Sequence, residues 1–222
     1  MATPEEILNL IRISDTFFPL GSFTVSQGME QLVADGLFDK GRFPGMARAY
    51  LEKIWMSFDF QIFSHSLEAY RNQDMGTFIR LDRLCHASKI TEENRAAMAK
   101  TGRNLAEAVH FGEGTPGARY KDMITGGETP GMYPVVLAAV SAEMNLGEQG
   151  GFSLIYVNLM EVTASLVRMA EIDYLEAQRV MAGVIQGLKP AVGGAQDISQ
   201  SFPAADIASM RHEASKSRMF IS

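Results

Sequence analysis

The sequence predicts an all-α protein, a single-domain bundle of about eight to ten helices with no significant sheet. Apolar residues recur at spacings of three and four, and the clearest stripe consists of Ala47, Tyr50, Leu51, Ile54, Trp55 and Phe58. No stretch alternates apolar and polar residues between hairpin turns, which is the pattern that strands require. No linker separates two independently apolar halves, so we expect residues 1–222 to form one domain.

Capping signals place the first helix. Thr3 is a good N-cap, Pro4 suits the first helical position and Glu6 completes a capping box. The apolar face of this helix is Ile7, Leu8, Leu10 and Ile11. The same signals predict further helices over 47–70, 75–87, 92–109, 134–146, 152–169 and 174–188.

Two of these helices carry a further expectation about burial. The helix over 134–146 has no charged residue before Glu143, so we expect protein to surround it. In the helix over 75–87 the residues expected to face inward are Phe78, Leu81, Leu84 and Cys85.

Two regions interrupt the helical pattern. Residues 112–131 are rich in glycine and contain two prolines, which predicts a long loop with one helical turn near 119–124. Residues 190–203 are rich in Gly, Ser and Asp and should be extended. The last residues, 204–222, can form a short helix followed by a tail.

Composition excludes several functional classes. The net charge of −6 and the pI near 5.3 argue against a nucleic-acid partner, because such proteins need cations to displace counterions from phosphate. The single cysteine, Cys85, excludes a disulfide framework and a multi-thiolate zinc site. The N-terminus lacks the cations and apolar core of a signal peptide, and no run approaches a membrane span of about 20 apolar residues. We therefore expect a soluble, cytoplasmic protein that does not contact a membrane.

The sequence carries few signs of catalysis. Residues 36–43 come nearest to a phosphate-binding loop, but they lack a lysine and a hydroxyl at the positions that such a loop requires. Glu107 and His110 form one E-x-x-H pair on a helix, whereas a di-iron bundle needs two such pairs and two more glutamates, so we interpret them as surface residues. Cys85 is interpreted as a core residue. Arg168 lies in an otherwise apolar helix, and it is either paired with a buried acid, a cap on a neighbouring helix, or an interface anchor.

Residues 10–36, LIRISDTFFPLGSFTVSQGMEQLVADG, resemble the N-terminal signature of the UreF family of urease accessory proteins. The matching positions are Ser14, Pro19, Gly21, Phe23, Ser26, Gly28, Glu30 and Gly36, while Val25 and Met29 depart from the pattern. The resemblance continues in LDRLCHASKITEENRAAMAKTGRNL, with Lys89, Glu93, Arg95 and Gly102, and in MYPVVLAAVSAEMNL, where Met132 and Ala138 depart. It also covers SLVRMAEIDYLEAQRV, with Arg168, and the closing ADIASMRHEASKSRMFIS.

The resemblance implies an all-α homodimer that is not an enzyme. UreF-like proteins act in nickel insertion into apo-urease as scaffolds that bridge UreD (also called UreH) and the GTPase UreG, and they modulate the GTPase cycle of UreG. No tightly bound cofactor and no resident metal ligand are implied, because the assembled complex handles nickel transiently. Two rival hypotheses are a helical carboxylate and histidine metalloenzyme built on Glu107 and His110, and a generic helical adaptor of another pathway.

We expect the contact residues to lie in two segments and one helix. In the turn at 17–23, Pro19 and Gly21 allow a tight reversal and the apolar side chains are aromatic anchors, unless they only seal the end of the bundle. The C-terminal segment, about 190–222, is expected to order on binding a UreD-like partner, unless it is a solvent-exposed terminal helix. The partner or dimer interface is predicted to include Phe17, Phe18, Pro19, Leu20, Gly21, Phe23, Ser26, Gly28, Glu30, Arg168, Asp206, Met210, Arg211, His212 and Glu213.

Overall fold

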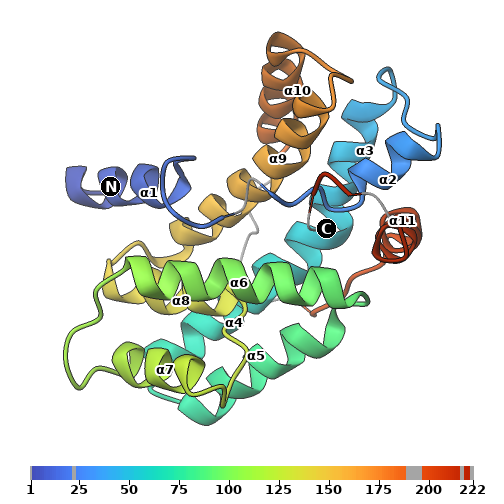
Figure 1. The fold of residues 1–222 in the computed structure, drawn as a ribbon. Coiled ribbons are helices and arrows are strands. Elements are labelled where there is room, and N and C mark those ends of the chain that lie inside the picture. Colours follow the sequence, from blue (N-terminus) through green and yellow to red (C-terminus); the bar gives the residue numbers. More distant parts are fainter. Residues whose placement is uncertain (1, 22–23, 189–196, 216–217, 221–222) are drawn as a thin grey trace.

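The computed structural model describes residues 2–21, 24–188, 197–215 and 218–220, and over these residues it contains helices and no strand (Figure 1). The all-α prediction is confirmed. The helices are α1 (Pro4–Ser14), α2 (Met29–Ala34), α3 (Phe43–Tyr50), α4 (Phe60–Arg71), α5 (Met75–Ser88), α6 (Glu92–Ala108), α7 (Pro116–Thr125), α8 (Tyr133–Glu143), α9 (Gly150–Arg168), α10 (Tyr174–Gln186) and α11 (Pro203–Glu213).

The predicted helix over 47–70 is part of a longer one. It begins at Phe43 with α3, passes through a π-helical segment, η2 (Leu51–Asp59), and continues as α4. A π-helical segment of this kind is uncommon and is often found at functional sites. The backbone N–H groups of Ser199 and Ser201 donate to carbonyl oxygens in this segment, so the extended chain before α11 lies against it.

α8 is the central helix of the core. Every residue from Val135 to Val140 is fully buried, which confirms the prediction from its missing charges. α4, α6 and α9 pack around it. Burying one such aliphatic side chain contributes about 1.5–3 kcal/mol, so this helix supplies much of the hydrophobic stabilisation of the bundle.

α9 and the 3₁₀ turn η3 (Gly147–Gln149) before it are long and apolar enough to span a membrane by length and composition alone. The mean hydropathy over the best window is 1.3, and 72% of that window is buried inside the protein. The sequence expectation that no apolar run approaches this length was therefore wrong for Gly147–Arg168. Its hydropathy is explained by its packing against α1, α8 and α10.

The region over 112–131 holds more helix than its composition predicts. α7 has ten residues, capped by the hydroxyl of Thr115 and started by Pro116, where one turn was expected. Gly117 is helical, and a Cβ there would lie 2.3 Å from the Phe111 ring. Glycine at this position therefore makes room for the ring and does not break the helix. The rest of the region is fixed from α5, since Asp82 accepts hydrogen bonds from Thr129 and from the N–H groups of Gly131 and Met132.

One expectation about burial is wrong. Leu84 was expected to face inward and is 44% exposed, because α5 lies at the edge of the bundle with a narrow buried face. In α1 the capping box is confirmed. Ile7, Leu8 and Ile11 of its apolar face are exposed, whereas Ile13 is buried and the helix packs on α9.

Candidate functional site

The candidate site lies where the N-terminal signature meets the C-terminal helix, since α2 packs against α11. Gly28 makes this approach possible. It is the N-cap of α2 with φ +86°, a conformation that favours glycine, and a Cβ there would lie 3.2–3.3 Å from Ser209, Ala205 and Ala208 of α11. Gly28 therefore lets α11 pack closely on α2, and Ser26 is fully buried, so Ser26 is not part of an exposed contact surface.

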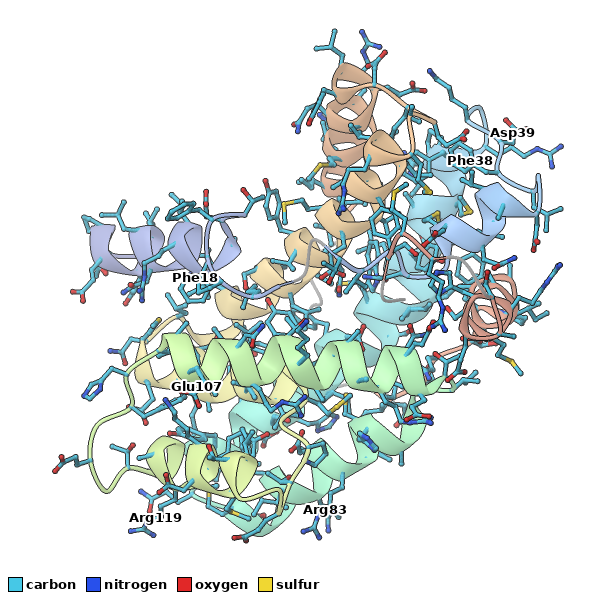
Figure 2. All side chains as sticks on the ribbon, in the orientation of Figure 1. Phe18, Phe38, Asp39, Arg83, Glu107 and Arg119 are labelled. Carbon is cyan, nitrogen blue, oxygen red and sulfur yellow. The ribbon has the colours of Figure 1, made fainter. Side chains whose placement is uncertain are left out.

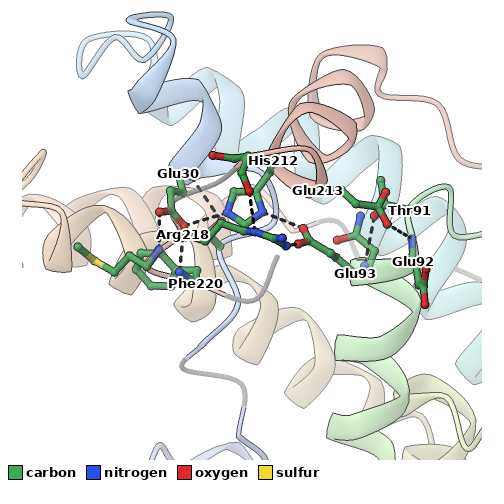
Figure 3. A network of polar contacts seen from close by, with 12 residues as sticks. Glu30, Thr91, Glu92, Glu93, His212, Glu213, Arg218 and Phe220 are labelled. Atoms are coloured by element: carbon green, nitrogen blue, oxygen red, sulfur yellow. Dashed lines mark hydrogen bonds and ion pairs between the residues drawn. The ribbon is translucent and has the colours of Figure 1, made fainter.

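A charged cluster fixes the end of the chain to this site (Figure 3). His212 is only 1% exposed; its Nε2 lies 2.9 Å from Oε2 of Glu30 and its Nδ1 lies 2.8 Å from Oε2 of Glu93. Each ring nitrogen faces a carboxylate, which only accepts hydrogen bonds, so a protonated ring satisfies both contacts. Arg218 pairs with the other oxygen of Glu93. We call Glu30, Glu93, His212 and Arg218 the tail clasp.

Glu30 is the centre of the tail clasp on α2. Besides His212, it accepts hydrogen bonds from the backbone N–H groups of Met219 and Phe220, at 2.6 and 2.9 Å. Burial raises the pKa of Glu30, but these N–H groups and His212 together outweigh burial, and the net direction is downward. The folded protein therefore favours the ionised carboxylate at this position.

Two further contacts flank the tail clasp. Arg211 forms an ion pair with Asp35 at the end of α2, with 2.8 Å between Nη1 and Oδ2. Glu213 accepts a hydrogen bond from the N–H of Glu92 at the start of α6, 3.1 Å away. The helix dipole also stabilises a negative charge at this N-terminus. α11 is thus tied to α2 on one side and to α6 on the other.

Arg168 belongs to the same region. It is exposed at the end of α9, and its guanidinium lies over the ring of Phe220, 4.6 Å from the ring centroid. Phe220 itself is buried. Arg168 therefore contacts the end of the chain, a role that sequence reasoning did not assign to it.

Several exposed residues around the tail clasp are apolar, and they lie beside the exposed Arg168, Arg211 and Arg218. Met210 and Met219 are 54% and 61% exposed, and Ile207 on α11 is also exposed. Asp206, in contrast, is half-buried and points to a cavity beneath α11, where burial raises its pKa. Adaptable methionine side chains next to fixed charges are typical of a surface that contacts another protein.

The aromatic turn before α2 divides into an exposed and a buried half. Phe17 is 95% exposed, and Pro19 is exposed beside it. Phe18, labelled in Figure 2, is half-buried against the core, and the Arg12 guanidinium lies over its ring. Leu20 is only 2% exposed, so Leu20 seals the bundle.

The backbone of this turn is fixed by its own geometry. Gly21 has φ +76°, which completes the reversal, and Asn104 donates a hydrogen bond to the Leu20 carbonyl. Phe23 lies outside the described residues.

A cavity of about 90 Å³ lies beneath α11 and was not predicted from the sequence. On one wall, Lys89 and Asp59 form a buried ion pair with 2.7 Å between Nζ and Oδ1. On another wall, Gln27 has φ +51° and its side chain donates to Asn158 and Glu161. Burial raises the pKa of Glu161 to about 8. Lys89 was noted only as a family position, and the partners of these groups are distant in sequence.

The structure does not support the E-x-x-H metal site. Glu107 lies on the side of α6 that faces α7 (Figure 2) and pairs with Lys121, 3.2 Å away, while His110 is exposed beyond the end of the helix. Within the described ranges, no three His, Cys, Asp or Glu side chains are grouped so that they could hold a metal ion. Cys85 is buried, as predicted, and burial raises the pKa of its thiol.

Comparison with known proteins points to one family. A model of the UreF family matches residues 38–185, about two thirds of the chain. The urease accessory protein UreF of Actinobacillus pleuropneumoniae serotype 3 (strain JL03) is 25% identical over 221 residues, which cover 96% of this chain and 97% of the relative. The UreF of Yersinia pseudotuberculosis serotype IB (strain PB1/+) is 23% identical over 223 residues, 97% of each. The chain belongs to the UreF family of urease accessory proteins.

Proposed function

We propose that this chain is a non-catalytic, cytoplasmic scaffold for nickel insertion into apo-urease. In this role it bridges a UreD/UreH protein and the GTPase UreG, and it modulates the GTPase cycle of UreG. Nickel is the cargo of the assembled complex, and this chain holds it at most transiently and has no tightly bound cofactor. The scaffold acts as a homodimer.

One observation carries this proposal. The segments around Glu30 and around His212, which carry the N-terminal and closing signatures noted in the sequence, are brought together by the fold through the tail clasp. Many of their polar groups fix the chain end, and the exposed side chains there include the apolar Ile207, Met210 and Met219 beside Arg211 and Arg218. Such an arrangement supports binding of a protein partner, because apolar and methionine side chains around a rigid centre form adaptable contacts.

The exposed Phe17 is a second contact point. An aromatic side chain that is 95% exposed can bury much apolar surface against a partner, whereas it stabilises the isolated chain very little. We assign Phe17 and the α11 surface to partner binding, without dividing them between UreD/UreH and UreG.

Co-purification tests the scaffold role. The tagged chain is expressed with UreD/UreH and UreG, with and without nickel and GTP, and the recovered amounts are measured. Met210→Asp is expected to lower recovery of at least one partner about tenfold or more, because it places a charge within an apolar contact. Tyr174→Asp, at an exposed position on α10, is the matched control and should leave recovery unchanged. Equal recovery with Met210→Asp would contradict the assignment of this surface.

A further inference from the structure

The cavity beneath α11 is lined by more acidic groups than basic ones. Among the described residues that line it, Asp59, Glu161 and Asp206 carry carboxyl groups, and Lys89 alone carries a positive charge. The three acids come from three different elements, η2, α9 and α11. Buried charges in proteins are paired, because leaving one unpaired costs much free energy. Three carboxyl groups here share one ammonium.

Lys89 balances only one of these acids. Its Nζ lies 2.7 Å from Oδ1 of Asp59 and 3.5 Å from Oε1 of Gln200. Within the described ranges, neither Glu161 nor Asp206 forms an ion pair. Burial, together with the charge of Asp59, raises the pKa of Glu161 to about 8, and burial also raises the pKa of Asp206. At pH 7 a proton on Glu161 therefore takes the place of a cation.

The acceptors on one wall are held in fixed positions by Gln27. This residue has φ +51°; its carbonyl accepts a hydrogen bond from the Tyr50 hydroxyl at 2.6 Å, and its Oε1 accepts one from Nε1 of Trp55 at 3.0 Å. Its Nε2 then donates to Oε2 of Glu161 at 2.8 Å and to Oδ1 of Asn158 at 3.1 Å. Glu161 is 7% exposed, and its other oxygen, Oε1, receives no hydrogen bond from any described residue. A buried acceptor that lines a cavity without a donor is the position at which a ligand donor is expected.

We propose that this cavity binds a small organic cation of the guanidinium type, held by Glu161 and Asp206. The cation is planar and presents several N–H donors in fixed directions, which suits carboxylates that lie on different elements. A metal ion fits less well, because no three His, Cys, Asp or Glu side chains among the described residues are grouped closely enough to hold one. When the cation enters, the proton of Glu161 leaves to the solvent, so the net charge of the cavity is unchanged.

The size of the cavity limits the ligand. An engineered cavity of about 150 Å³ admits benzene, which has six non-hydrogen atoms. By that standard, the cavity of about 90 Å³ admits about four non-hydrogen atoms, the number in guanidinium. A ligand this small makes few contacts, so we expect a Kd on the order of 0.1–1 mM.

Isothermal titration calorimetry of the full chain with guanidinium chloride, at pH 7 and constant ionic strength, tests the site. Urea is the matched neutral ligand, since it has the same shape and the same number of non-hydrogen atoms. Guanidinium should bind at least tenfold more tightly than urea. Titrations in phosphate and in Tris, whose ionisation enthalpies differ, measure the protons released. About 0.9 proton should leave per cation bound, because a group with a pKa of about 8 is mostly protonated at pH 7.

Three variants locate the binding. Glu161→Gln keeps an acceptor for Gln27 but cannot become charged, so it should weaken guanidinium binding about tenfold or more and abolish proton release. Asp206→Asn should weaken binding about threefold and keep the proton release. Glu148→Gln, which removes an exposed acid elsewhere, is the control and should behave as the wild type does. The midpoint of thermal unfolding shows whether each variant keeps the fold.

Equal binding of urea and guanidinium would overturn the proposal, as would wild-type binding without proton release. Guanidinium binding that is unchanged in Glu161→Gln would show association with the protein surface only, and would equally overturn it. This inference does not depend on the proposed function, and no partner protein is present in the experiment. The scaffold role is therefore judged separately, by co-purification.

Discussion

Nε2 of His212 lies 2.9 Å from Oε2 of Glu30, so a residue near the end of the chain is paired with one in its first 30 residues. His212 is buried and faces a second carboxylate, Glu93, through its other ring nitrogen. The contact joins the N-terminal and C-terminal signature segments, and it holds α11 over the cavity lined by Asp59, Lys89 and Glu161.

Removing His212 should destabilise the protein. His212→Ala leaves Glu30 and Glu93 close together without the group that separates them, and an unbalanced buried charge costs about 3 kcal/mol. For a chain of this length that lowers the Tm by about 10 °C. Thermal unfolding at pH 7 measures the change. His110→Ala, at an exposed position, is the control and should leave the Tm within about 1 °C. Equal Tm values for the two variants would show that the clasp contributes nothing.

The lowered pKa of Glu30 predicts an acid-sensitive tail clasp. A carboxyl group whose pKa is lower in the folded state stabilises the fold above its unfolded pKa, near 4.5, and that stabilisation is lost as the pH falls through the folded pKa. Urea unfolding between pH 3 and 7 should show a loss of stability below about pH 4.5 that is smaller in Glu30→Gln. Identical pH profiles for the two proteins would refute the role of Glu30.

The raised pKa of Glu161 predicts that stability falls with rising pH, the opposite of the effect of Glu30. The pKa of Glu161 is raised to about 8 by burial, so between about 4.5 and 8 the folded chain keeps a proton that the unfolded chain has lost. Stability attributable to this group therefore falls as the pH rises through that window. Glu161→Gln, which mimics the neutral acid, should flatten the decline between pH 5 and 8 and be more stable than the wild type at pH 8. A wild-type slope kept in the variant would contradict this.

Gly28→Ala should loosen the packing of α11 on α2. The new Cβ meets Ser209, Ala205 and Ala208 at a positive φ, which should cost about 1–3 kcal/mol. Gly45→Ala in α3 is the matched control, since a Cβ there meets nothing within 4 Å and the helix gains about 0.5–1 kcal/mol. Urea unfolding compares the two, and the changes should have opposite signs. A Gly28→Ala protein as stable as the wild type would show that α11 does not depend on this contact.

Substitutions at Phe17 and Leu20 distinguish partner binding from folding stability in the aromatic turn. Phe17→Asp should leave the Tm within about 2 °C and reduce recovery of UreD/UreH or UreG, because its side chain is exposed. Leu20→Asp should unfold the protein, because it places a charge in the core. Phe18→Asp should fall between them, since Phe18 is half-buried. Destabilisation by Phe17→Asp would assign this residue to the core.

Local signals predicted most of the fold. The capping box at Thr3 and the charge-free run after Tyr133 each depend on residues close in sequence, and each is confirmed. α7 was underestimated because Gly117 counts as a breaker in any local reading. Its actual role, making room for the Phe111 ring, depends on tertiary packing.

The candidate site was only partly predictable for the same reason. Glu30, Arg168 and His212 were selected through their resemblance to a family, but their contacts are distant in sequence. The contacts of Glu30 join residues more than 100 positions apart, and Arg168 meets Phe220 from another element. The buried pair of Lys89 and Asp59 carries no local motif at all. The exposed face of α1 was also hidden, because an amphipathic pattern shows where apolar residues lie and does not show which face the chain covers.

The nickel content of urease produced with and without this chain tests the central claim most directly. Urease subunits, UreD/UreH and UreG are co-expressed with the wild-type chain, with Met210→Asp, or with no such chain, and purified urease is analysed for bound nickel and activity. We expect urease to be loaded only with the wild-type chain, and loading with Met210→Asp to fall in proportion to partner recovery. Urease that is equally loaded without the chain would contradict the scaffold role.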